Sequence, residues 1–560
     1  MLKKISLFNI IFLVYIINFF VKNNNNNILI GLSLFSILCE ILYLKYKKNL
    51  FLINSSILIS IISSYIFKVY YFEIINYICV VMLSINLYRL IIILKLRREI
   101  SSYILLFLIP YTIEKSLVYK VYTLKKEILF INIFLTFILF FYNMKRLKIN
   151  KKNLLDESLR VLILLYPFFL IKRGSSDEIH FFISILILFK VIINRKNKKI
   201  KFERLLMLLS ILSIFGIILS LFNNRISQYT LVHLKEYINN IGIFILLLLL
   251  NKKNIDINKI LKNTYLCLLL IICNIYPILL ETNFTFGRIS GNWNISTYSF
   301  IVGLFTVILL YINLINKKYD LLLITILLYV LVLFSGTRMI WLIVIAISML
   351  ICILSNNIKI YIGAFFVVIV LGLSYKSLEN NNPIKARIKT YFHIKTNTSS
   401  GSRIYMYKEA IEQFKQKPIT GNGFVTYGER AYTRHQEELN NRQLENYDKI
   451  QEAYGNYRYH AHSNFFEMLC GTGVIGTGLF YLLNFTIFWI LISNRIKKNN
   501  ITICEIGILI FIFYHLYGVS DATIYMKRVS ELYYWFIGVI LSYIRKGDLD
   551  NVKRSTNKNV

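Results

Sequence analysis

The chain has 560 residues, of which 56% are hydrophobic and 17% are charged, and its mean hydropathy is +0.57. Soluble domains carry roughly 25% charged residues, so this composition excludes an ordinary soluble protein. Apolar runs of about 17–25 residues, each long enough to cross a bilayer, recur along the chain. We therefore predict an all-α polytopic integral membrane protein.

The basic residues give a formal net charge of +36, which in a soluble protein would suggest nucleic-acid binding. Here they lie mostly in short connectors between apolar runs, for example at Lys45–Lys48 and Arg195–Lys201. This distribution is typical of topology signals that face anionic lipid. We expect membrane lipids around the chain and no nucleic-acid partner.

About eighteen candidate spans follow one another, and the first, Ile5–Val21, is expected to be retained because it lacks a signal-peptide cleavage site. The approximate cores of the spans are residues 5–21, 28–44, 51–67, 72–94, 101–117, 127–143, 158–171, 179–194, 203–222, 237–250, 261–280, 297–315, 319–335, 338–355, 358–375, 464–493, 501–518 and 529–545. With the N-terminus inside, most inside connectors are basic, which predicts that both termini are cytoplasmic. The basic segment Lys115–Lys126 departs from this pattern.

The spans divide the chain into an N-terminal transmembrane extension at 1–200, core helices at 201–375, an extracytoplasmic loop at 376–463, C-terminal helices at 464–545 and a cytoplasmic tail at 546–560. The loop is the sizeable polar segment, and a long ordered loop is usually functional. Within it, Arg403–Gln416 predicts an amphipathic helix whose apolar residues, at helical spacing, are Ile404, Tyr407, Ile411 and Phe414. We expect this helix to end at Pro418, Gly421 and Gly423, and a further helix within Arg430–Tyr459.

The sharpest functional signal is Tyr459–Leu469, where the loop meets the next span. His460, His462, Asn464 and Glu467 gather there at the boundary between water and lipid. A polar cluster at such a boundary is costly and is a functional candidate by default. A histidine has the pKa needed to take a proton from a hydroxyl near neutral pH. The following glycines are spaced as in small-residue helix packing: Gly471, Gly473, Gly476 and Gly478.

Three arginines occupy turns that the predicted topology places on the outer face: Arg288 between Gly287 and Gly291, Arg338 after Ser335-Gly336-Thr337, and Arg403 after Gly401-Ser402. Each alone is also compatible with an arginine that reaches the lipid headgroups or caps a helix. Together they predict a diphosphate site, because guanidinium groups bind phosphate oxygens in a fixed fork geometry. Arginines with one histidine, and no metal-type cluster, fit transfer of a group from a diphosphate to an alcohol without a metal or cofactor.

Several motifs, in this order, resemble the O-antigen ligase/polymerase superfamily over roughly residues 200–545. They are Arg288-Ile289-Ser290-Gly291, Ser335-Gly336-Thr337-Arg338, Ser400-Gly401-Ser402-Arg403, Pro418 with Gly421-Asn422-Gly423, His462-Ser463-Asn464 with Glu467, and Gly473-Val474-Ile475-Gly476. The resemblance implies a GT-C-like helical bundle in the bacterial cytoplasmic (inner) membrane, with one long extracytoplasmic loop that contains short helices. The enzyme that the resemblance implies is a glycosyltransferase that needs no metal.

The resemblance also implies roles for individual residues. His462 is the expected general base, and Arg288 and Arg338 are expected to bind the diphosphate and stabilise its developing charge. Arg403 is expected to shape the loop or contact phosphate. Asn464 and Glu467 are expected to orient His462, and His460 is a weaker candidate for the base.

Several reactions fit this prediction. A ligase would transfer a finished glycan from undecaprenyl diphosphate to an acceptor hydroxyl such as that of lipid A-core. A polymerase would transfer it to another lipid-linked glycan, and a protein O-oligosaccharyltransferase would use a protein acceptor. A transporter or flippase for the lipid-linked glycan is the alternative from another class, but it would need polar residues near the midplane of spans that here are largely free of charge.

Overall fold

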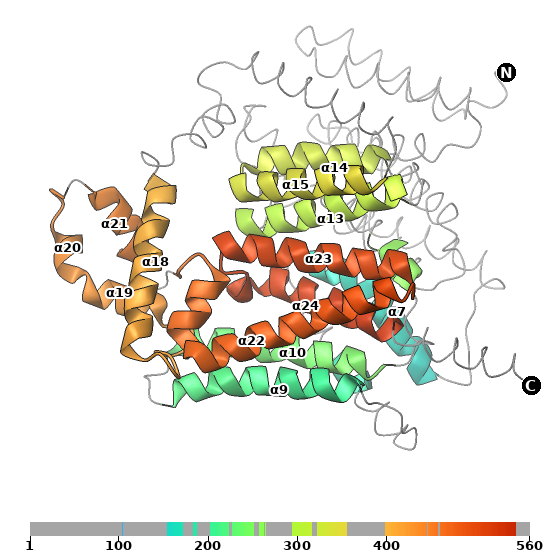
Figure 1. The fold of residues 1–560 in the computed structure, drawn as a ribbon, viewed down its shortest axis with the longest axis horizontal. Coiled ribbons are helices and arrows are strands. Elements are labelled where there is room, and N and C mark those ends of the chain that lie inside the picture. The colour runs from blue at the N-terminus through green and yellow to red at the C-terminus, as the bar shows by residue number, and fades with distance from the viewer. Residues whose placement is uncertain are drawn as a thin grey trace, which may run out of the picture. The chain divides into compact units, whose positions relative to one another are not determined.

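The computed structural model describes residues 104, 154–171, 183–187, 202–222, 227–250, 257–262, 264, 294–315, 322–355, 398–444, 446–456 and 460–544. Within these ranges the regular structure is helical and no strand occurs, as the all-α prediction requires (Figure 1). Most of them belong to one compact unit formed by residues 150–261, 284–315 and 328–560. The other unit, residues 1–149, 262–283 and 316–327, lies almost entirely outside the described residues, as do most of the predicted N-terminal spans.

The apolar helices coincide with predicted spans. They are α7 (Leu154–Ile171), α9 (Phe202–Leu221), α10 (Gln228–Leu248), α13 (Ile295–Ile315), α14 (Leu322–Ser335), α15 (Arg338–Ser355), α22 (Asn464–Ile496), α23 (Ile501–Ser520) and α24 (Lys527–Ile544). In the described part of the chain, α9, α10, α13, α22 and α23 are long and apolar enough to cross a membrane. The chain is therefore a polytopic membrane protein.

Helix α10 begins well before its predicted core of 237–250. The Ser227 side chain accepts a hydrogen bond from the Thr230 backbone N–H (3.1 Å) and caps the new start. The added turns are polar, and His233 there lies 3.0 Å from Glu236. Hydropathy alone missed these turns because they carry polar side chains, two of which, His233 and Glu236, pair with each other.

The glycines of α22 have different roles. Gly476 packs against Gly216 of α9, where a Cβ on Gly216 would lie 3.0 Å from the Gly476 Cα, so the small-residue prediction is confirmed there. A Cβ on Gly478 would meet no atom within 4 Å, so this glycine makes no such close contact. The prediction is wrong for Gly473, whose φ of 62° and ψ of −166° break the helix.

The segment after α18 docks into this break of α22. The backbone N–H groups of Asn422–Gly423 donate to the carbonyls of Cys470–Gly471 (3.0 and 2.8 Å), and the Val474 N–H donates to the Pro418 carbonyl (2.9 Å). Breaking a helix frees backbone donors and acceptors, which must find partners when buried. The loop thus satisfies the groups that Gly473 releases, and it is fixed to the membrane helix.

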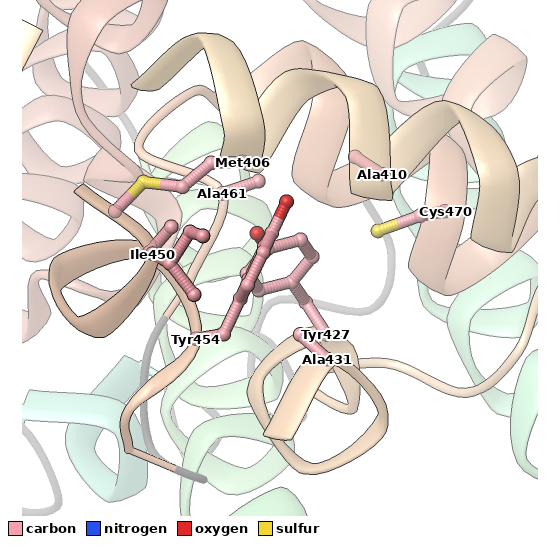
Figure 2. Packing of buried hydrophobic residues seen from close by; sticks show 9 residues of the cluster. Met406, Ala410, Tyr427, Ala431, Ile450, Tyr454, Ala461 and Cys470 are labelled. Carbon is pink, nitrogen blue, oxygen red and sulfur yellow. The ribbon is translucent and has the colours of Figure 1, made fainter. Parts of the chain in front are cut away.

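The loop region folds into α18 (Thr398–Gln416), α19 (Tyr427–Arg434), α20 (Gln436–Asn440) and α21 (Tyr447–Tyr454). Their shared core also includes residues just before and within α22 (Figure 2). Its buried members are Met406, Ala410, Tyr427, Ala431, Ile450, Ala453, Tyr454, Ala461 and Cys470. The helix predicted at 403–416 and its end before Pro418 are confirmed, while the single helix expected after residue 430 is several short ones.

The apolar face expected for α18 is wrong at two positions. Ile404 is 54% exposed and Ile411 is 38% exposed, whereas Met406 and Ala410 are buried. The bulk of the core comes from the Tyr427 and Tyr454 rings on neighbouring helices, so α18 contributes small or flexible side chains to it (Figure 2).

His435 ties three of these helices together. Its Nε2 lies 2.9 Å from Glu409 Oε2 and its Nδ1 lies 3.0 Å from Glu438 Oε2. Its ring stacks on Tyr454, with centroids 4.0 Å apart. The hydrogen bond with Glu409 raises the pKa of His435, against the effect of burial, and the charges of Glu409 and Glu438 add to the increase. The imidazolium is therefore the form that stabilises the loop region.

We expect His435→Gln to destabilise the protein in acid more than in base. Because the folded-state pKa is raised, the stabilisation is complete below the unfolded value of about 6.5 and fades as pH rises through the folded value. Hydrogen bonds to charged groups contribute about 1.5–3 kcal/mol. The measurement is the difference in thermal unfolding midpoint between wild type and variant at several pH values. A difference that does not shrink with rising pH would contradict the role of the charge.

Candidate functional site

The candidate site forms where several helices begin or end at one place. His460 and His462 immediately precede α22, and Asp521 immediately follows α23. His462 Nδ1 lies 3.3 Å from Asp521 Oδ1, and His460 Nε2 lies 4.0 Å from the same oxygen. The His462 Nδ1 atom is buried and has no well-aligned hydrogen bond, although the side chain as a whole is 33% exposed. The ring is thus held near a carboxylate while part of it reaches the surface.

Asp521 is fixed in place and is ionised. The Tyr517 hydroxyl donates to Oδ2 (3.2 Å), and the Ala522 backbone N–H donates to Oδ1 (3.0 Å). Burial raises the pKa of Asp521, but the facing His462 ring, the nearby His460 and the charge of Arg403 outweigh it, so that the pKa lies below its ordinary value. The site therefore contains a buried carboxylate aimed at an imidazole.

His460 holds the backbone of His462. The His462 N–H donates to His460 Nδ1 (3.2 Å), and the ring centroids lie 4.2 Å apart. Burial, with the charge of His462 next, lowers the pKa of His460 to about 4, so its imidazole is neutral and can accept this bond. His462 has a φ of 47°, a left-handed conformation that costs a non-glycine residue about 1–2 kcal/mol. Strain at such a residue persists when its surroundings enforce it.

Asn464 and Glu467 connect the two halves of the site without bonding to His462 itself. Asn464 Nδ2 donates to Thr523 Oγ1 (2.6 Å), and its Oδ1 accepts from the Ile524 N–H (3.2 Å). Glu467 Oε2 accepts from the Ala461 N–H (2.6 Å), and its Oε1 accepts from the Tyr525 hydroxyl (2.9 Å). Both side chains are buried and tie the start of α22 to the turn that follows Asp521.

The predicted arginines are placed differently from one another. Arg403, on α18, is close enough that its charge lowers the pKa of both His460 and Asp521. Arg338 begins α15 next to Thr337, whose hydroxyl lies 2.7 Å from Ser299 on α13. The start of α13 in turn contacts the end of α23, where Phe300 packs on Tyr517. Arg338 is thus at the same end of the bundle, and Arg288 lies outside the described residues.

Sequence reasoning missed Asp521. The aspartate is a single acid in the short connector between the spans predicted at 501–518 and 529–545. Under the predicted topology this connector shares the outer face with His462, which was the available signal. His460, His462 and Asp521 also offer three ligand atoms within 4.8 Å of one another, a spacing that a divalent cation could bridge.

Comparison with known proteins identifies one family. Residues 321–481 match the family model described as O-antigen ligase. No curated protein matches the chain. The matched segment contains Arg338, Arg403 and His462, whereas Arg288 and Asp521 lie outside it. Over residues 321–481, the chain is therefore similar to the O-antigen ligase superfamily of membrane proteins.

Proposed function

We propose that this protein is an O-antigen ligase-type glycosyltransferase that moves a glycan from an undecaprenyl-diphosphate donor to an acceptor hydroxyl. The observation that carries the proposal is the 3.3 Å distance between Asp521 Oδ1 and His462 Nδ1, where α23 ends and α22 begins. A carboxylate at one ring nitrogen favours the tautomer in which that nitrogen carries the proton. The other nitrogen, Nε2, is then free to accept a proton from a substrate.

The proposed reaction is a displacement at the anomeric carbon of the donor. The acceptor oxygen forms a bond to that carbon as the bond to the diphosphate oxygen breaks, and the diphosphate leaves with the electron pair. His462 Nε2 takes the hydroxyl proton, and ionised Asp521 stabilises the resulting imidazolium. Neither step requires a metal or cofactor.

The arginines are assigned to the departing diphosphate. Arg403 supports this role because its charge acts on His460 and Asp521, which places it in the neighbourhood of the site. Arg338 supports it through its place at the same end of the bundle, and Arg288 is assigned on its motif alone. Positive groups fixed where negative charge develops lower the barrier without reorganising during the reaction.

The proposed location is the outer face of the cytoplasmic membrane. The basic segments Lys252–Lys253 and Arg495–Lys498 lie at or just after the ends of α10 and α22 that are away from the site. Basic connectors favour the cytoplasmic side, so the site would face outward, with both termini inside. The acceptor proposed is a hydroxyl of lipid A-core or of another glycan.

Reconstituted protein with extracted undecaprenyl-diphosphate-linked glycan and candidate acceptors tests this function. We expect transfer to the acceptor, unchanged by EDTA and inhibited by added Zn²⁺, because the ion would occupy His460, His462 and Asp521. The products are separated by size, since a ligase adds a glycan once and a polymerase gives a ladder. Loss of activity in EDTA that a divalent ion restores would overturn the metal-independent mechanism, and no transfer to any hydroxyl acceptor would overturn the function.

A further inference from the structure

A cleft of ≈ 470 Å³ that is lined by polar and charged residues lies in the loop region, apart from the histidine cluster. It is open to the surface and is bordered by α18, the segment that docks into α22, and α19. Its lining residues are Glu409, Gln413, Gln416, Asn422, Thr426, Glu429, Arg430, Thr433 and Arg434. Its volume falls within the range of about 300–1,000 Å³ that is typical of small-molecule sites. None of its lining residues has an apolar side chain, which sets it apart from a cavity left by imperfect packing.

Two buried amides in this lining have unused acceptor atoms. Gln413 donates from Nε2 to Glu409 Oε1 (2.9 Å) and to the Tyr427 carbonyl (3.1 Å), but its Oε1 has no partner. Asn422 donates from Nδ2 to the Gln413 and Cys470 carbonyls, and its Oδ1 has no partner. Both side chains are almost completely buried. An unmade hydrogen bond at a buried atom costs about 1–3 kcal/mol, so a donor that reached these oxygens, from water or from a bound molecule, would be stabilised there.

The charges around the cleft disfavour an ionic ligand. Glu409 already lies 2.9 Å from His435 Nε2 and 3.6 Å from Arg434, so its negative charge is compensated. The carboxylates of Glu409 and Glu429 and the guanidinium groups of Arg430 and Arg434 balance one another, so neither a cation nor an anion meets a net opposite charge there. A neutral molecule with hydroxyl groups fits both conditions, because each hydroxyl can donate to an amide oxygen and accept from a guanidinium.

We infer that this cleft binds a neutral sugar unit of the glycan on which the enzyme acts. The identity of the ligand as part of that glycan rests on the proposed function, whereas its hydroxyl chemistry rests on the cleft alone. Gln413 and Arg403 belong to the same helix, ten residues apart, which is about 15 Å along its axis. A glycan of a few sugar units with its reacting end beside Arg403 would reach the cleft with a later unit. The cleft would thus select the glycan while the histidine cluster performs the transfer.

Binding is tested with the full-length protein in lipid nanodiscs, which avoids sugar-based detergents. Saturation-transfer NMR is recorded with glucose, galactose, rhamnose, N-acetylglucosamine and N-acetylgalactosamine, and with glucuronate as the anionic comparison. We expect saturation transfer to at least one neutral sugar and none to glucuronate. Absence of transfer to every neutral sugar, or equal transfer to glucuronate, would overturn the inference.

Two matched variants locate the binding. Gln416 lines the cleft and is exposed, so Gln416→Trp is expected to fill the mouth of the cleft while the fold is kept. Its exposed neighbour Lys415 does not line the cleft, so Lys415→Trp is the control. We expect Gln416→Trp to weaken sugar binding roughly tenfold or more, equivalent to losing about one good hydrogen bond, and Lys415→Trp to leave it unchanged. Equal binding in the two variants would place the sugar elsewhere and overturn the inference.

A third variant separates this inference from the proposed function. His462→Ala is expected to retain sugar binding, since His462 does not line the cleft. In transfer assays with extracted lipid-linked glycan, Gln416→Trp is expected to raise the KM of one substrate. A raised donor KM assigns the cleft to the donor glycan, and a raised acceptor KM assigns it to the acceptor. If the wild-type protein binds sugar but transfers no glycan, the sugar site is supported and the proposed transferase function is wrong.

Discussion

Replacing His462 with alanine is expected to lower the rate of glycan transfer by about 10²–10⁴-fold, the usual contribution of a general base. The reason is that the imidazole beside Asp521 is the group proposed to take the proton of the acceptor hydroxyl. Asp521→Asn is expected to cost about 10²-fold or more, because its amide can present an N–H to the ring and favour the wrong tautomer. The measurement is initial rate with purified donor, after gel filtration has shown that each variant is folded.

His460→Ala provides the comparison for these variants. His460 accepts a hydrogen bond from the His462 backbone and is therefore expected to position the base, not to act as one. Its loss should reduce the rate less than His462→Ala and leave the pH dependence of the rate unchanged in position. If His460→Ala loses most of the activity while His462→Ala keeps it, the assignment of the base to His462 is wrong.

The membrane helices follow from hydropathy because lipid imposes one requirement on every span, namely an apolar stretch with all backbone groups bonded internally. This rule located α13, α15, α22 and α23 closely. It failed at the start of α10, where His233 and Glu236 pair with each other. It also gives no information on α18, whose burial depends on the tyrosines of neighbouring helices.

The site residues that are close together in the sequence could be predicted, and the one that is distant in the sequence could not. His460, His462, Asn464 and Glu467 lie within one motif, and the sequence places them together. Asp521 joins them only because α22 and α23 pack side by side and bring the start of one helix to the end of the other. Periodicity describes each helix separately and carries no signal for such a pairing.

The break in α22 is the feature on which the position of this motif depends. A Cβ on Gly473 would lie 2.4 Å from the Ile419 carbonyl oxygen, and one on Gly421 would lie 2.3 Å from the Gly471 carbonyl oxygen. Both glycines have positive φ values, and the conformation of Gly473 is one that essentially only glycine adopts. The loop and the helix therefore approach each other so closely that a methyl group added to either glycine would force them apart.

Gly473→Ala is expected to destabilise the protein by about 2–6 kcal/mol, the sum of about 1–3 for backbone strain and about 1–3 for overpacking. Gly478→Ala, in the same helix, is the matched control, because a methyl there meets no atom within 4 Å and alanine favours a helix. The thermal unfolding midpoint in nanodiscs should fall for the first variant and stay level or rise for the second. Since the break holds the loop against α22, transfer activity should fall with Gly473→Ala even below its unfolding midpoint. If Gly473→Ala has the same thermal unfolding midpoint as wild type and transfers glycan normally, the close approach of the loop to α22 is not needed.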